Sequence, residues 1–356
     1  MSSFNDAYFK FIKKLIPSRV KGTVVGLEFG LFACKIVEIA RKGAGFEVVR
    51  WAVEPVDSAN EKAVLEKIIA ALGQSPKPRL VVASVGGKGT LIRYVDMPRM
   101  SMADLRRVFA FETDKYFPFP KDSVYTDCKI LEPTDGGRKM SVLVAAVKKE
   151  LVNSRLKQLK EAGLEVESIS LHPAAVASAF AVIPPPGAAP NDFKACAIID
   201  IGESVTNLMI MAGGLPRFNR DIFVGMQEVY KRVSNLAGVT LAEARTLLAP
   251  GAAPSEPLTK GVESVMAGLI SEIRLSFDYF TTEKNLAVSQ MFLVGDGAVL
   301  PSVLKSFTDG FDTPIAKWDP FDKVSFGPQA DRERFAVNAP GLVAAFGLAV
   351  AEYDQA

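Results

Sequence analysis

One pattern occurs twice in the 356-residue chain and constrains its fold more than any other feature: a strand, a turn with a central glycine, and a returning strand. The first copy spans Val24–Ile39 and the second spans Ala197–Met211. Three consecutive prolines precede the second copy, and they cannot continue a helix or a central strand. We therefore predict two similar lobes with a cleft between them, joined by a linker at Ile183–Pro190.

The remaining patterns predict an α/β protein. A third strand is expected at Phe46–Val53, an amphipathic helix at Glu61–Leu72 and a buried strand at Arg79–Val85. Three strands, a helix and a strand form the opening of a ribonuclease-H-like lobe, although the pattern alone supports only the α/β class. Residues 88–167 are predicted to form a compact α+β piece. Further helices are expected at Met102–Tyr116, Glu150–Ala162, Met226–Leu236, Leu241–Leu248, Glu263–Thr282, Leu300–Phe307 and Ala339–Ala351.

The composition excludes several classes of function. The 42 basic and 40 acidic residues give a net charge of +2, so no general attraction to nucleic acid is expected. His172 is the only histidine, which excludes a histidine-rich zinc site. The three cysteines lie far apart and fit a reducing compartment. The longest apolar run, Leu342–Ala351, is shorter than the roughly 18 residues of a spanning helix.

Residues 4–16 combine aromatic residues at helical spacing with several lysines. A basic amphipathic helix of this kind can lie on an anionic membrane surface. The alternatives are a leader helix that packs on the domain, or a segment that is partly disordered.

Two turns carry residues suited to a phosphate or a nucleotide. In AIIDIGESVTNLMI, Asp200 ends an apolar strand and Gly202 permits a sharp turn. Ser204 and Thr206 add hydroxyl donors for a phosphate, and Asp200 can hold the hydration shell of Mg²⁺. The alternative is an ordinary hairpin with a polar tip.

The second turn, LVGDGAVLP, joins a strand to a helix, where a flat base or a ribose can approach closely. Its candidate ligand-binding residues are Gly295, Asp296, Gly297 and Ala298.

The order of these turns resembles the actin-like ATPase superfamily, whose two lobes each begin with a phosphate loop and close around ATP. Within it the chain resembles the PilM family, the FtsA-like proteins of type IV pilus assembly. GLEFGLFACKIVEIA resembles the opening of that family, and Lys35 and Glu38 keep its K-x-x-E ending. A second stretch matches at Met97, Pro98, Glu112, Tyr116, Pro118 and Pro120. The resemblance extends over about residues 22–351.

The resemblance implies an actin-like ATPase fold, with two ribonuclease-H-like lobes around a nucleotide cleft and an FtsA-type 1C insertion. The implied divisions are an amphipathic segment at 1–21, subdomain 1A at 22–87 with 168–183 and 339–356, subdomain 1C at 88–167, subdomain 2A at 194–225 with 286–338, and subdomain 2B at 226–285.

Three positions depart from the family pattern. Glu28 replaces an aspartate of the first phosphate loop, where it could still reach a metal, and Leu31 and Phe32 replace hydroxyl residues. Bulky apolar side chains cannot donate hydrogen bonds to phosphate. The alternative is that these side chains point away and the backbone N–H groups still bind the phosphate. His172 replaces a carboxylate that positions water; we favour a role in capping its helix or plugging the cleft over a catalytic one. Asp296 replaces a glycine of the adenosine turn.

From the resemblance we expect a cytoplasmic platform protein at the inner membrane that binds the tail of a PilN-like membrane protein beside subdomains 1A and 1C. Candidate groove residues are Tyr94, Phe109, Phe111 and Tyr116, whose alternative role is the 1C core. We expect at most weak binding of ATP and Mg²⁺, and weak or absent hydrolysis.

The candidate cofactor-binding residues are Gly30, Lys35, Asp200, Gly202, Ser204, Thr206, Gly295, Asp296, Gly297 and Ala298. The candidate metal ligands are Asp200 and Glu28, and the catalytic candidates are Glu28, His172 and Asp200. The alternative functions are an FtsA-like cell-division protein, a platform protein of type II secretion, and an active ATPase or kinase of the same fold.

Overall fold

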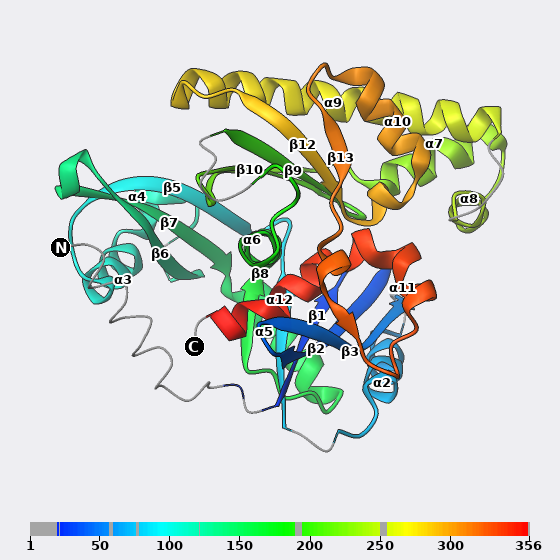
Figure 1. Ribbon diagram of the computed structural model, residues 1–356, viewed down its shortest axis with the longest axis horizontal. Coiled ribbons are helices and arrows are strands. Elements are labelled where there is room, and N and C mark those ends of the chain that lie inside the picture. The colour runs from blue at the N-terminus through cyan, green and yellow to red at the C-terminus, as the bar shows by residue number, and fades with distance from the viewer. Residues whose placement is uncertain are drawn as a thin grey trace.

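The computed structural model describes residues 20, 22–56, 60–75, 78–120, 122–188, 194–249 and 255–354. The amphipathic segment at 4–16 lies outside the described residues. Figure 1 shows two lobes, one above the other, with a smaller third unit at the side. Each unit is built on its own sheet, with six, five and three strands. The predicted α/β class is confirmed.

The first lobe is built on the sheet β14-β3-β2-β1-β4-β8. Its strands are β1 (Thr23–Phe29), β2 (Ala33–Lys42), β3 (Gly45–Pro55), β4 (Arg79–Val85), β8 (Ser168–Leu171) and β14 (Ser325–Phe326). Strand β1 pairs antiparallel with β2 and parallel with β4. Its first five residues are buried, as expected for a central strand covered on both faces. One cover is α2 (Glu61–Leu72), through Leu65 and Ile68.

The second lobe repeats this arrangement in the sheet β11-β10-β9-β12-β13. Its strands are β9 (Ala195–Ile201), β10 (Thr206–Ala212), β11 (Leu215–Ile222), β12 (Val288–Val294) and β13 (Ile315–Lys317). Strand β9 pairs antiparallel with β10 and parallel with β12, as β1 does with β2 and β4. The predicted repeat is therefore a repeat of structure.

Helices cover the outer face of the second sheet, at the top of Figure 1. They include α7 (Met226–Ala237), α9 (Glu256–Lys284) and α10 (Pro301–Gly310), and the short helix α8 (Leu241–Leu247) packs against α7 at the side. Apolar residues of these four helices form one buried cluster with the sheet, including Val229, Ala244, Leu269 and Val303.

Two helices lie at the junction of the lobes: α6 (His172–Val182) and α12 (Val343–Asp354). They approach closely because Gly347 of α12 has no side chain; a Cβ there would lie 1.9 Å from the carbonyl oxygen of Ala175. Phe180 and Phe346 belong to a buried cluster that also holds Ile198 of the second sheet. The lobes therefore share part of their core.

The segment Arg332–Tyr353, which includes α11 (Arg332–Asn338) and α12, is long and apolar enough to cross a membrane by length and composition. However, 72% of its most apolar 18-residue window is buried inside the protein. This burial is what a core helix of a folded domain shows.

The third unit consists of the sheet β5-β7-β6 and the helices beside it. Its elements are β5 (Thr90–Pro98), α3 (Met102–Phe111), α4 (Thr113–Tyr116), β6 (Val124–Thr134) and β7 (Lys139–Lys148). Helix α5 (Lys149–Glu161) follows β7 but packs on the first lobe, where Leu159 belongs to the same buried cluster as Leu65 of α2. The helix predicted at Met102–Tyr116 is interrupted at Glu112, whose φ of −113° and ψ of 29° leave the helical region.

One strand departs from the expected divisions. Strand β14 falls within 286–338, which the resemblance assigns to subdomain 2A, but it pairs with β3 of the first sheet. The other subdomain boundaries stay predictions.

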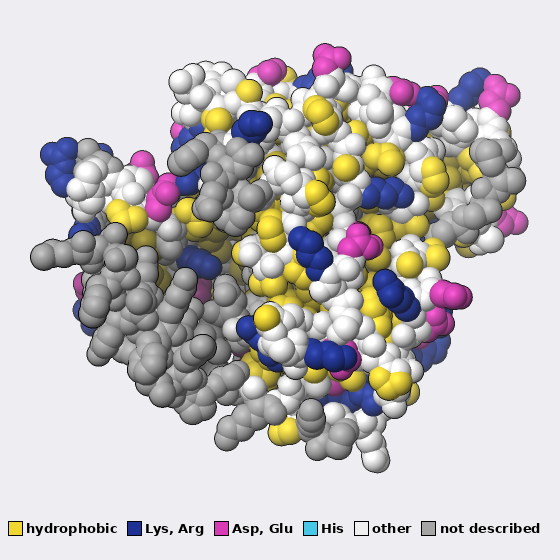
Figure 2. All heavy atoms as spheres, in the orientation of Figure 1, with side chains coloured by type: hydrophobic (Ala, Val, Ile, Leu, Met, Phe, Trp, Pro, Cys, Tyr) yellow, Lys and Arg dark blue, Asp and Glu magenta, His cyan; other side chains and the backbone are white. Residues whose placement is uncertain are grey.

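On the face shown in Figure 2, basic and acidic side chains are interspersed, in keeping with the small net charge.

Candidate functional site

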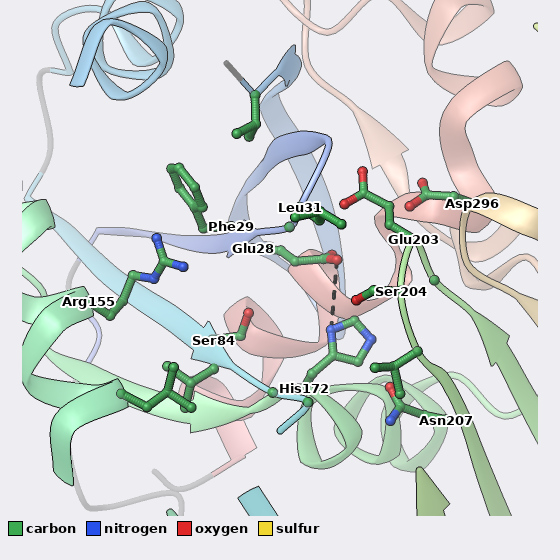
Figure 3. A pocket seen from close by; sticks show the side chains of 18 of the residues that line it. Glu28, Phe29, Leu31, Ser84, Arg155, His172, Glu203, Ser204, Asn207 and Asp296 are labelled. Atoms are coloured by element: carbon green, nitrogen blue, oxygen red, sulfur yellow. Dashed lines mark ion pairs between the residues drawn. The ribbon is translucent and has the colours of Figure 1, made fainter. Parts of the chain in front are cut away.

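The candidate site is a cavity of about 340 Å³ between the two lobes, bordered on one side by α5. The turns after β1 and β9 face each other across it, because these strands hold equivalent central places in the two sheets (Figure 3). Its wall includes Leu31 from the first turn, Glu203 and Ser204 from the second, and His172 from the start of α6. Arg155 reaches it from α5.

The first turn places its two bulky residues differently. Leu31 lines the cavity and is 46% exposed. The ring of Phe32 packs edge-on against Tyr230 of α7, with 6.0 Å between the ring centroids. The guanidinium carbon of Arg245, on α8, lies 4.4 Å from the centre of the Phe32 ring. Leu31 thus takes the space where hydroxyl donors were expected, and Phe32 anchors the turn to the second lobe.

The backbone N–H of Phe32 is already paired. It donates to Oε2 of Glu203, 2.5 Å away, in the turn of the other lobe. Gly30 makes this approach feasible, because a Cβ there would lie 2.8 Å from the same oxygen. Burial, together with the charge of Asp296, raises the pKa of Glu203 to about 7, although Lys35 and the Phe32 N–H act in the opposite direction.

Lys35 connects β2 to the second lobe. Its Nζ lies 2.8 Å from Asp296 and 3.6 Å from Oε1 of Glu28, and its side chain is only 4% exposed. Burial alone would lower the pKa of Lys35, but the carboxylates of Asp296, Glu28 and Glu203 outweigh it and raise the pKa. Lys35 is therefore charged and forms an ion pair across the cleft.

Glu38, the other residue of the K-x-x-E ending, serves the sheet and not the cleft. It is fully buried, and it accepts hydrogen bonds from Thr23, Arg50 and Arg79. Two guanidinium groups and a hydroxyl satisfy this buried carboxylate, as a buried charge requires.

His172 forms a second ion pair across the cleft. Its Nε2 lies 2.6 Å from Oδ2 of Asp200. Its Nδ1 lies 3.8 Å from Oε1 of Glu28, the contact marked by the dashed line in Figure 3. Burial would lower the pKa of His172, but the charge and hydrogen bond of Asp200, helped by Glu28, raise it to about 9. Helix α6 has no side-chain cap hydrogen bond, so His172 does not cap it. Its imidazole instead lies in the cleft, between Asp200 and Glu28.

The donors and ligands expected for ATP and Mg²⁺ are thus largely engaged by the protein itself. Asp200 is held by His172, Asp296 by Lys35, and the Phe32 N–H by Glu203. Burial raises the pKa of Glu28, and among the described residues its Oε2 finds no hydrogen-bond partner. No group of three acidic, histidine or cysteine residues in the described ranges is arranged to hold a metal. The residues as placed do not fit a bound Mg²⁺-nucleotide.

The other predicted cofactor residues divide into two groups. Gly202 and Ser204 line the cavity. Thr206 does not: its hydroxyl donates to the carbonyl of Val224, 2.8 Å away, because alternate residues of β10 face opposite sides of the sheet. Gly295 has a φ of +85°, and a Cβ there would lie 2.3 Å from Oδ1 of Asp200. The turn Gly295–Ala298 therefore packs tightly on the end of β9, where the turn between β9 and β10 begins.

The four predicted partner residues also differ. Phe109 is 1% exposed and lies in the core of the third unit, which removes it from any surface. The ring of Tyr116 packs 5.0 Å from that of Phe109 and is partly buried. Tyr94 is partly buried, whereas Phe111 is 68% exposed.

Sequence reasoning missed four side chains of this region: Glu203, Arg155, Tyr230 and Arg245. Arg155 lies over the ring of Phe29 at 4.1 Å, and Arg245 and Tyr230 receive Phe32. For Glu203 the sequence held one signal, which was its position between Gly202 and Ser204: an acidic residue is unexpected in a turn that is otherwise suited to phosphate.

Two lobes that each open with strand, turn and strand, facing each other across a cleft, define the actin-like ATPase fold. Residues 26–353 match the family described as type IV pilus assembly protein PilM, and the chain belongs to that family.

Solved structures agree with the fold. A chain of the "PilM-PilN type IV pilus biogenesis complex" superposes with a TM-score of 0.81 at 23% identity, over 94% of this chain and 99% of that one. The ethanolamine utilization protein EutJ from Carboxydothermus hydrogenoformans is more distant, with a TM-score of 0.54 at 13% identity, over 95% of this chain and 93% of that one.

Proposed function

We propose that this chain is a platform protein of type IV pilus assembly that binds the cytoplasmic tail of a PilN-like inner-membrane protein. One observation carries the proposal: the chain matches the PilM family over residues 26–353 and shares its fold, nearly end to end, with a chain solved in a PilM–PilN complex. The protein would accordingly work in the cytoplasm, at the inner membrane.

The tail would bind beside subdomains 1A and 1C. In support, the lining of the cavity includes Phe29 and Val56 of the first lobe, and Leu151 and Arg155 of α5, the helix that follows the sheet of the third unit. Apolar side chains with one guanidinium group suit an extended peptide that carries apolar residues and an acidic group or carbonyl oxygens. Of the aromatic candidates, Phe111 has the most exposed surface for such a partner.

Hydrogen exchange with a synthetic tail peptide tests this assignment. The peptide is expected to slow exchange within 88–167, because backbone N–H groups under a bound peptide are shielded and their local opening is suppressed. A peptide with the same composition in scrambled order is the control. Protection confined to 194–338 would contradict the assignment to subdomain 1C.

We also propose that the cleft binds ATP weakly or not at all and hydrolyses it negligibly. Phosphoryl transfer depends on positioning and on charge stabilisation, and the groups expected to supply both are engaged in contacts between the lobes. Calorimetry with and without Mg²⁺, together with an ATPase assay, tests this. Strong Mg²⁺-dependent hydrolysis that is lost in Asp200→Ala would refute it and restore Glu28 and His172 as catalytic candidates.

A further inference from the structure

The turn between β9 and β10 carries a carboxylate, that of Glu203, which reaches into the turn between β1 and β2. Oε2 of Glu203 lies 2.5 Å from the backbone nitrogen of Phe32, although the two residues are 171 positions apart in sequence. Backbone N–H groups in a glycine-containing turn are a common binding site for anions. The occupant of this N–H is an anion that belongs to the protein.

Two features around this contact would also suit a phosphate oxygen. Gly30 leaves room for an oxygen beside the turn, since a Cβ would come within 2.8 Å of the Glu203 carboxylate. The buried ammonium group of Lys35 interacts with Glu203, and the carboxylates of Glu28 and Asp296 are its acidic neighbours. A donor, a cation and an open space would remain if the Glu203 carboxylate were removed.

We propose that Glu203 is a built-in anion that occupies a phosphate position of the first turn and thereby excludes phosphate-bearing ligands from the cleft. It acts in two ways. Its oxygen accepts the hydrogen bond that a ligand would need. In its ionised form the carboxylate also repels a second anion at the same place, where the low effective dielectric of a protein interior makes repulsion strong. Glu203 is thus a specificity-determining residue.

The turn is held in this state from two sides. The backbone N–H of Phe32 is bound by Glu203, and the Phe32 ring packs against both Tyr230 and the guanidinium group of Arg245. Both contacts join the first lobe to the second. Release of Glu203 therefore frees the donor without removing the aromatic contact that keeps the turn in place.

The test measures binding of two probes, inorganic phosphate and ATP with Mg²⁺, to the full chain by calorimetry. The variants are Glu203→Ala, which removes the carboxylate, and Glu203→Gln, which keeps an acceptor oxygen without the charge. Glu66→Ala, on the exposed face of α2, is the matched control. Urea unfolding of each variant confirms the fold, and Glu203→Gln keeps the test valid if Glu203→Ala fails to fold.

We expect Glu203→Ala to bind ATP about a hundredfold more tightly than the natural chain, equivalent to ~2.7 kcal/mol, and Glu203→Gln to gain about tenfold. Phosphate should also bind to Glu203→Ala, and Glu66→Ala should behave as the natural chain does. Unchanged affinity for both probes in the two Glu203 variants would overturn the inference. The inference rests on the proposed weakness of ATP binding, which fails separately if the natural chain already binds ATP tightly.

Discussion

The ion pair between His172 and Asp200 predicts a specific dependence of stability on pH. The pair joins α6 of the first lobe to β9 of the second across 2.6 Å, with the imidazole 18% exposed. The pKa of His172 is raised from 6.5 to about 9 in the folded chain. A difference of this size corresponds to about 3 kcal/mol of free energy of unfolding.

The sign of the effect follows from proton binding. Between pH 6.5 and about 9 the folded chain keeps the His172 proton that the unfolded chain has released. The contribution of the pair is therefore complete below pH 6.5 and is lost as the pH rises through about 9. Glu203, with its pKa raised to about 7, also makes stability fall with rising pH, but it does so in a lower range that begins near pH 4.5.

The assay is urea unfolding of the natural chain, His172→Gln, Asp200→Asn and the double variant at a series of pH values. The difference between the natural chain and His172→Gln isolates His172, since the other groups titrate in both. We expect this difference to decline by about 3 kcal/mol between pH 6.5 and 9. The cycle with Asp200→Asn should assign most of it to this pair. A difference that stays constant from pH 6.5 to 9 would show that Asp200 does not raise the pKa of His172 in the folded chain.

Two further predictions concern the other ion pair and the N-terminal segment. Lys35→Met leaves Glu28 and Asp296 without their buried cation, so urea unfolding should show a free energy of unfolding lower by about 3 kcal/mol. The control variant Lys62→Met, at an exposed position, should change the free energy of unfolding little. Equal stability of the two variants would contradict a charged, paired Lys35. If residues 4–16 contact anionic lipid, deletion of residues 1–19 should abolish co-sedimentation with anionic vesicles and leave the unfolding transition unchanged. Equal sedimentation of the full chain and the shortened chain would contradict lipid binding by residues 4–16.

Local patterns predicted much of the fold because they depend on neighbouring residues. The helix Glu61–Leu72 and the strand Arg79–Val85 lie where their patterns place them, since Asn60 caps the helix and a proline-containing connection separates the two. Strands β13 and β14, with three and two residues, are too short to show a period. The pairing of β14 with β3 depends on contacts nearly 280 residues apart, which no local pattern encodes.

The sequence predicted which residues lie at the cleft better than it predicted which side chains pair with one another there. Asp200, Gly202 and Asp296 lie at the cleft, as their turns indicated. The partners of Asp200 and Asp296 come from the other lobe, and only closure of the lobes brings them together. Glu203 escaped notice for the same reason: a glutamate in a turn is usually solvated, and its burial arises from a contact with a distant loop.

We expect this member of the PilM family to bind a PilN-like membrane partner without the help of a nucleotide. The most direct test is the affinity of the tail peptide of a PilN-like protein for the full chain, measured by calorimetry with and without ATP and Mg²⁺. Because the contacts across the cleft are made by Lys35, His172 and Glu203, the two dissociation constants should agree within about twofold, which means almost no coupling between the sites. Tail binding that appears only with ATP, or tightens at least about tenfold with it, would contradict the claim.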